Sequence, residues 1–171
     1  MIEHYRMFAD YNRWANRRLY QAASGLSDAQ YREDMGAFFG SLHHTLNHLL
    51  VTDRIWMKRF TGSGEAPALL DAILFDDFAD LASARAVEDE RIIAWIHSLT
   101  EDDLAGRFTY RPITNPAPVT QRLAPPLAHL FNHQTHHRGQ CHMMLTALGQ
   151  PSLALDLVYF LRTPEGKAYA G

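Results

Sequence analysis

Four long segments of this chain carry apolar residues at the three- and four-residue spacing of an amphipathic helix, and this periodicity constrains the fold more than any other feature. The segments run over about residues 2–23, 37–60, 77–98 and 125–149. Pro125 and Pro126 suit the first turn of the last segment, because the amide groups there have no partner within a helix. The pattern predicts an all-α fold, a four-helix bundle.

The pattern changes between the third and fourth segments. Residues 107–111 and 119–123 alternate between apolar and polar side chains, and residues 112–118 between them are rich in proline. We therefore predict a short β-hairpin, or an extended excursion, between helices three and four. After the last helix, the apolar residues 155–161 are expected to pack back onto the bundle.

Size and charge narrow the possible functions. The 171 residues correspond to one ordinary domain, residues 1–171, whose core can bury about 70% of the surface of the unfolded chain. Neither a metal nor a disulfide is needed to hold such a fold together. A formal net charge of −3 gives no long-range attraction for phosphate backbones, so nucleic acid is not an expected partner.

The chain also lacks the signals of a membrane or secreted protein. Its apolar runs are interrupted well short of the ~20 residues that a membrane span requires, and no basic segment precedes an apolar one at the N-terminus. We expect no membrane association and a cytoplasmic location. The single cysteine, Cys141, cannot form an intramolecular disulfide, and its position within the last helix favours packing in the core.

Two histidines four residues apart, His133 and His137, lie in the last predicted helix. That spacing places them about 40° apart around the helix axis, so both rings can reach one ion. A third histidine from another helix would complete the open three-ligand arrangement of catalytic zinc. The alternative is that these are solvated or packed histidines, since the chain has ten.

A short internal repeat indicates where the third histidine lies. The pattern His-x-x-Asn-His occurs at residues 44–48 and again at residues 129–133, each time after a turn with a helix-capping pattern. If the two halves are related by a pseudo-twofold axis, His48 and His133 face each other across the bundle, where metal sites are built from opposed helices. A chance match is the alternative.

Three stretches resemble the DinB family, also described as DinB/YfiT-like metalloenzymes. They are residues 11–16 (Tyr-Asn-Arg-Trp-Ala-Asn), residues 38–56 and residues 130–140, and the resemblance extends over about residues 5–162. It implies a four-helix bundle that binds one divalent metal through three histidines, usually as a homodimer. Carried over by position, the ligands are His48, His133 and His137.

Other polar residues are candidates for pocket contacts or for contacts between helices. By resemblance the first helix lines the family's pocket, so Asn12 and Asn16 are candidates for pocket contacts, with helix–helix hydrogen bonds as the alternative. Asp53 and Arg138 are expected to pair with opposite charges on neighbouring helices. The remaining histidines near the motifs are expected either to contact the ligand histidines without binding the metal or to be surface groups. They are His43, His44, His129, His136 and His142.

Three functions remain open. Three neutral imidazoles leave the ion's full charge available to lower the pKa of bound water to about 7 or to hold a thiol as thiolate. The resemblance favours transfer of a low-molecular-weight thiol to a small electrophile. Zinc, nickel, iron and manganese all accept imidazole ligands, and the order of binding affinities favours zinc and nickel over manganese. Metal-dependent hydrolysis is the second possibility, although no His-Glu-x-x-His motif is present. A non-catalytic metal- or ligand-binding stress protein is the third.

Overall fold

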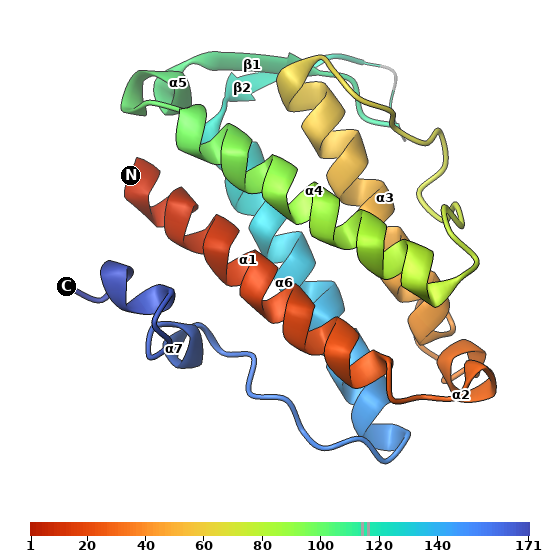
Figure 1. Cartoon of the computed structure of the whole chain (residues 1–171). Helices are drawn as coiled ribbons and strands as arrows, with labels where there is room; N and C mark the ends of the chain where they lie inside the picture. The colour runs from red at the N-terminus through yellow and green to blue at the C-terminus, as the bar shows by residue number, and fades with distance from the viewer. Residues whose placement is uncertain (114, 116) are drawn as a thin grey trace.

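Four long helices form the body of the molecule in the residues that the computed structural model describes, which are 1–113, 115 and 117–171. They are α1 (Ile2–Ala23), α3 (Leu42–Thr61), α4 (Phe78–Ser98) and α6 (Ala124–Ala147). Helix α1 packs against α4 and α6, and α3 packs against the same two helices (Figure 1). The predicted all-α four-helix bundle is confirmed.

The two predicted capped turns are short helices. Helix α2 (Asp28–Arg32) follows α1, and α5 (Glu101–Ala105) follows α4. Each begins with a capping box, in which the cap residue and the third helical residue bond to each other's backbone amide. The caps are Ser27 and Thr100, so the two halves of the repeat share their local chemistry as well as their histidine pattern.

The helix expected from residue 37 instead begins at Leu42. Gly36 and Gly40 have φ angles of 68° and 76°, which an α-helix does not permit. The side chain of Ser41 then accepts a hydrogen bond from the backbone amide of His44 and caps the helix. The loop before α3 therefore includes Phe39, which reaches the histidines described below.

The predicted hairpin is present and lies across one end of the bundle. Strands β1 (Arg107–Tyr110) and β2 (Val119–Arg122) pair antiparallel, with Tyr110 opposite Val119. The turn expected at residues 112–118 includes Thr114 and Pro116, which lie outside the described residues. The ring of Tyr110 contacts Trp56 of α3 at a centroid distance of 5.0 Å, so the hairpin approaches the C-terminal half of that helix.

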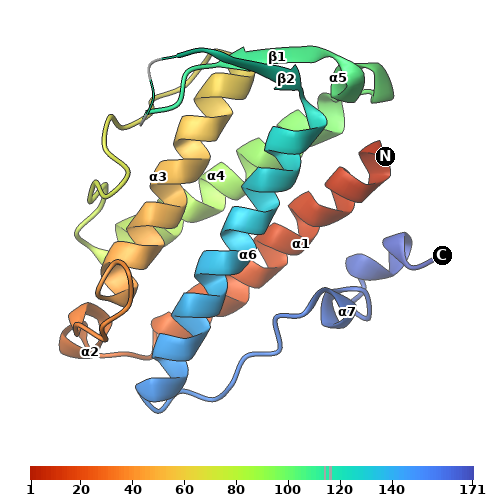
Figure 2. The same cartoon turned by 180° about the vertical axis from the view of Figure 1, so that it is seen from behind.

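The C-terminal tail packs back onto the bundle, as predicted, and it does so against α1. It contains α7 (Leu157–Phe160) and the 3₁₀ helix Gly166–Tyr169, and it runs beside α1 and α6 in Figure 2. Phe160 is fully buried, and its ring contacts those of Tyr11 and Trp14. The hydroxyl of Tyr11 donates a hydrogen bond to the carbonyl of Leu155, which fixes the start of the tail.

The core has an apolar cluster at each end of the bundle and a polar layer between them. One cluster includes Tyr5, Ile92 and Leu127, and the other includes Leu19, Leu46 and Cys141. Cys141 is fully buried, as expected, and burial raises the pKa of its thiol to about 12. Within the described residues, no helix is both long enough and apolar enough to span a bilayer.

Candidate metal centre

Three histidines from two facing helices converge on one side of the bundle. His48 comes from α3, and His133 and His137 come from successive turns of α6. The Nε2 atoms of His48 and His133 are 3.3 Å apart, and one nitrogen from each of the three rings lies within 4.8 Å of the others. His48 and His133 thus face each other, as the internal repeat predicted.

The nitrogen spacing suits a metal ion. Two imidazole nitrogens bound to one zinc ion at the usual ~2.0–2.1 Å in tetrahedral geometry lie about 3.3–3.4 Å apart. The Nε2 atoms of His48 and His133 have this separation. These three residues are the one group of potential ligands of this kind among the described residues. The donor set therefore fits a divalent transition metal.

Hydrogen bonds to the other ring nitrogens set the tautomers of two of the histidines. Nδ1 of His48 is 2.7 Å from the carbonyl oxygen of Leu70, and Nδ1 of His137 is 2.7 Å from Oε1 of Gln140. Because these oxygens only accept, each Nδ1 carries the proton and donates it. Each Nε2 is left with a free lone pair, the usual arrangement of a metal-binding histidine with a supporting hydrogen bond.

The three imidazoles are held in their neutral form. Burial lowers the pKa of His48 and His137. The pKa of His133 falls to about 3, first because of burial and then because His137 and His48 are close. At neutral pH protons do not compete for these nitrogens, so all three are ready to bind a cation.

Two loop residues that the sequence did not reveal cover the histidines. The ring of Phe39 stacks on His48 at a centroid distance of 4.0 Å and lies 5.6 Å from His137. Leu70, in the loop between α3 and α4, supplies the carbonyl that orients His48. The Phe39 position falls in a motif of the family, but nothing in the local sequence predicts its contact with a histidine.

A cavity of about 300 Å³ opens beside the histidines. His48 and His133 are among the residues that line it, together with Trp56, Arg59 and Tyr110. The cavity gives a small molecule access to the histidine cluster. Neither Arg59 nor Tyr110 belongs to a sequence motif that predicts a place in the site.

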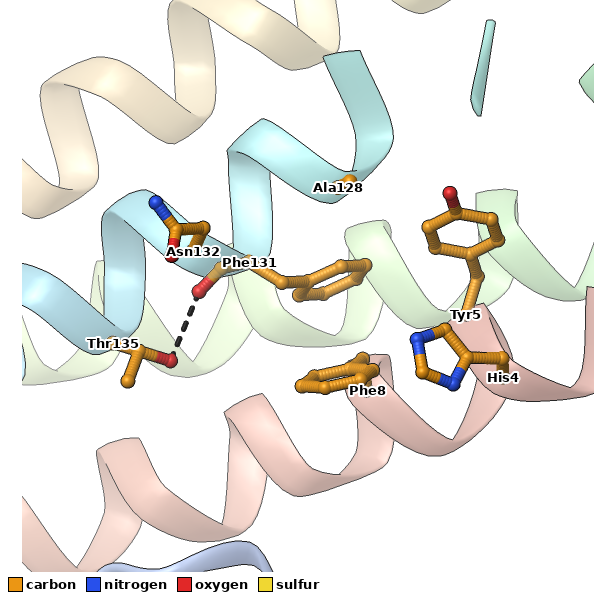
Figure 3. Close-up of a pocket in the computed structure, with 7 residues that line it drawn as sticks. All are labelled: His4, Tyr5, Phe8, Ala128, Phe131, Asn132 and Thr135. Carbon is orange, nitrogen blue, oxygen red and sulfur yellow. Dashed lines mark hydrogen bonds between the residues drawn. The ribbon is translucent and has the colours of Figure 1, made fainter. Parts of the chain in front are cut away.

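A second hollow, of about 310 Å³, lies between α1 and α6 and is apolar in character (Figure 3). Phe8 and Phe131 stack within it at a centroid distance of 5.8 Å. Its α6 residues, such as Asn132 and Thr135, face away from the histidine cluster, and none of the three clustered histidines lines it. The candidate chemistry therefore belongs to the cavity between α3 and α6.

Asn12 and Asn16 are buried in the polar layer and take part in helix–helix hydrogen bonds. Both amide groups donate to Oδ1 of Asp89, at 3.4 Å and 2.9 Å, and both amide oxygens accept from Arg138. Neither residue is among those lining the cavity beside the histidines. Their amides serve the helix–helix role that was the alternative to pocket contact.

The expected ion pair of Asp53 is present, whereas Arg138 forms no ion pair with any of the described residues. Asp53 bonds to Arg85 at 2.6 Å, and Arg85 also pairs with Asp89 at 3.0 Å. The guanidinium of Arg138 instead bonds to amide and hydroxyl oxygens of its own helix and of α1, because Asn12 and Asn16 lie between it and Asp89. These contacts link the four long helices directly behind the histidine cluster.

The other histidines named above lie outside the cluster. His44 bonds to Ser41, His142 bonds to Ser152 and Leu153, and His43 packs on Tyr31. His136 reaches Gln140, the residue that orients His137. His129 lines the cavity, and its ring lies 5.6 Å from that of His133.

The fold and the cluster together define a class of protein, helical bundles with a three-histidine group able to hold a metal ion. The sequence profile of the DinB family matches residues 1–167, and this chain belongs to that family. It is 27% identical over 168 residues to Protein DinB of Bacillus subtilis (strain 168), a match that covers 93% of this chain and 95% of that protein. The family resemblance seen in the sequence is thereby confirmed.

Proposed function

We propose that this protein is a metal-dependent enzyme that transfers a small thiol to an electrophilic small molecule. One divalent cation per chain would be held by His48, His133 and His137. The observation that carries the proposal is the convergence of these rings, two of which donate a hydrogen bond from Nδ1 and so keep a lone pair on Nε2. Zinc and nickel are among the divalent metals that imidazole ligands suit.

The chemistry requires a ligand position that the protein leaves open. A divalent cation bound here supplies a Lewis acid that lowers the pKa of a thiol or water molecule. In the proposed reaction a sulfur–carbon bond forms, the bond from that carbon to its leaving group breaks, and the thiol proton departs with the leaving group. Three protein ligands leave room for a small molecule, and the adjoining cavity provides its route.

The chain's own residues orient the ligands and limit the access of water. The carbonyl of Leu70 and the amide of Gln140 fix the rotation of the His48 and His137 rings. Phe39 covers both rings from the side of the loop before α3. Where little water enters, the attraction between a cation and an anion is stronger. This favours the thiolate form of a thiol bound to the metal ion.

Hydrolysis of an amide or ester is a second candidate, supported by one observation. His129 lies in the cavity near His133, and burial together with the charge of Arg59 lowers the pKa of its imidazole. A neutral imidazole at that position can accept a proton from water. Among the described lining residues no carboxylate is available for this task, so thiol transfer is the stronger proposal.

The test is the consumption of an electrophile such as 1-chloro-2,4-dinitrobenzene in the presence of cysteine, glutathione, bacillithiol or mycothiol. We expect turnover with metal-loaded protein, none with chelator-treated protein or His137→Ala, and normal turnover with the control His142→Ala. Metal-dependent turnover of esters without thiol would assign a hydrolase. Absence of metal-dependent turnover across a broad panel would favour a non-catalytic binding protein.

We also propose, from the family resemblance, that the protein is a cytoplasmic homodimer. Light scattering coupled to size-exclusion chromatography tests the dimer, since the chain mass is 19.5 kDa. A mass equal to that of one chain over a range of protein concentrations would contradict it.

A further inference from the structure

Arg59 is fixed in the cavity by aromatic side chains. Its guanidinium carbon lies 4.7 Å from the centre of the Trp56 ring and 5.2 Å from that of Tyr110. One nitrogen donates to the carbonyl of Arg111 at 3.2 Å. Contacts of this kind hold the planar group in one orientation, so its remaining N–H donors are directed by the protein rather than by solvent.

The charge of Arg59 has no acidic partner in the part of the chain that the structure describes. Among the described residues, no carboxylate oxygen lies within 4.0 Å of its guanidinium, whereas Arg54 on the same helix pairs with Glu88 and Arg85 pairs with Asp53. Arg59 is half-buried, and burial lowers its pKa. Withdrawing a charge from water without a counter-ion is unfavourable, so a bound anion would stabilise this arrangement.

Helix geometry places Arg59 and the histidine cluster along one face of α3. Arg59 follows His48 by eleven residues, which is about three turns, some 20° around the axis and roughly 16 Å along it. Thr52 and Trp56 lie between them on the same face and also line the cavity. A molecule that reaches the histidines from this cavity therefore extends toward Arg59.

The cavity is suited to a negatively charged molecule. Its described lining contains no aspartate or glutamate. With a divalent cation on the histidines and the guanidinium further along the cavity, the local potential is positive from one end to the other. A guanidinium held in a fixed plane can donate two parallel hydrogen bonds to a carboxylate or phosphate.

We infer that Arg59 is an oxyanion-binding residue, and that the cavity takes a small molecule whose carboxylate or phosphate pairs with Arg59 while its other end reaches the metal. This inference rests on the proposed metal-dependent function, because the second contact is the ion. It specifies the substrate class: an acidic small molecule, either the thiol or the electrophile. Trp56 and Tyr110 contribute by holding the guanidinium in place.

The experiment compares an acid with its neutral ester in Co²⁺-loaded protein. Binding of 3-mercaptopropionate and of methyl 3-mercaptopropionate is measured from the visible absorption of the cobalt. We expect wild-type protein to bind the acid about tenfold to a hundredfold more tightly than the ester, the usual range for a hydrogen-bonded charged group. Arg59→Gln should bring the ratio near one, and Arg59→Lys should give an intermediate value.

Lys58→Gln is the matched control, because Lys58 is the neighbouring cation on α3, is exposed and does not line this cavity. It should retain the wild-type preference for the acid. Competition with acetate and with inorganic phosphate then tells whether a carboxylate or a phosphate is the preferred group. No preference for the acid in wild-type protein, or an equal loss in Lys58→Gln and Arg59→Gln, would overturn the inference.

A readout without metal separates this inference from the proposed function. If cobalt does not bind the three histidines, the metal site fails, and acetate and phosphate are titrated into metal-free protein by tryptophan fluorescence. Trp56 lies against Arg59, so anion binding should change its emission in wild-type and Lys58→Gln protein but not in Arg59→Gln. An unchanged signal in wild-type protein would then refute the anion site as well.

Discussion

Removal of the Asp53 carboxylate tests how much the buried polar layer contributes to the stability of the bundle. Asp53 and Arg85 are almost completely buried and bond at 2.6 Å, joining α3 to α4. Replacing one partner of a buried ion pair typically costs about 3–5 kcal/mol, because it leaves the other charge buried without compensation. Arg85 keeps its contact with Asp89, so we expect Asp53→Ala to lie near the lower end, at about 3 kcal/mol.

That loss is a large share of the usual ~5–15 kcal/mol of total stability and corresponds to a decrease in Tm of roughly 6–12 °C for a chain of this size. The assay is urea unfolding of metal-free protein followed by circular dichroism, with Glu90→Ala as the control. Glu90 pairs with Arg13 at 3.0 Å, but its side chain is 56% exposed, so its loss should cost about 0–1 kcal/mol. Equal destabilisation by the two substitutions would refute the reasoning.

Three further predictions follow from burial and linkage. Chelation should leave the helical circular-dichroism signal intact and lower the Tm, since metal at 100 times its Kd adds about 2.7 kcal/mol to an already folded chain; loss of helicity at room temperature would contradict this. Below pH 6.5 the metal-free protein should lose stability as the pH falls toward 3. The unfolded chain protonates its histidines in this range, whereas His133 has a folded-state pKa of about 3. In urea titrations, His133→Gln should make the free energy of unfolding depend less steeply on pH. Cys141 should react with a thiol reagent only on unfolding, since burial raises its pKa to about 12, and Cys141→Ser should retain thiol-dependent turnover.

The parts of the fold that depend on local spacing could be predicted from the sequence. Helical periodicity predicted the four long helices, and the capping patterns at Ser27 and Thr100 predicted the short turns that follow α1 and α4. The four-residue spacing of His133 and His137 fixed both rings on one face, and the internal repeat placed His48 opposite them. Each of these features is set by residues a few positions apart.

Features that depend on tertiary packing could not be predicted. The contact of Phe39 with His48 requires the path of a loop, and the position of Tyr110 requires the docking of the hairpin on α3. Arg138 was expected to meet a carboxylate, but two amide side chains from α1 lie between the charges. Arg59 was not predicted either, although the sequence held a signal for it: its eleven-residue separation from His48 places both residues on one face of α3.

The most direct test of the proposed metal centre is elemental analysis of purified protein and its single-histidine variants. Wild-type protein should contain one equivalent of divalent transition metal per chain, and His48→Ala, His133→Ala and His137→Ala should each lose most of it. His142→Ala and His97→Ala should keep it, because neither side chain belongs to the cluster. Equal metal content in all five variants, or equal loss in all five, would contradict the three-histidine assignment.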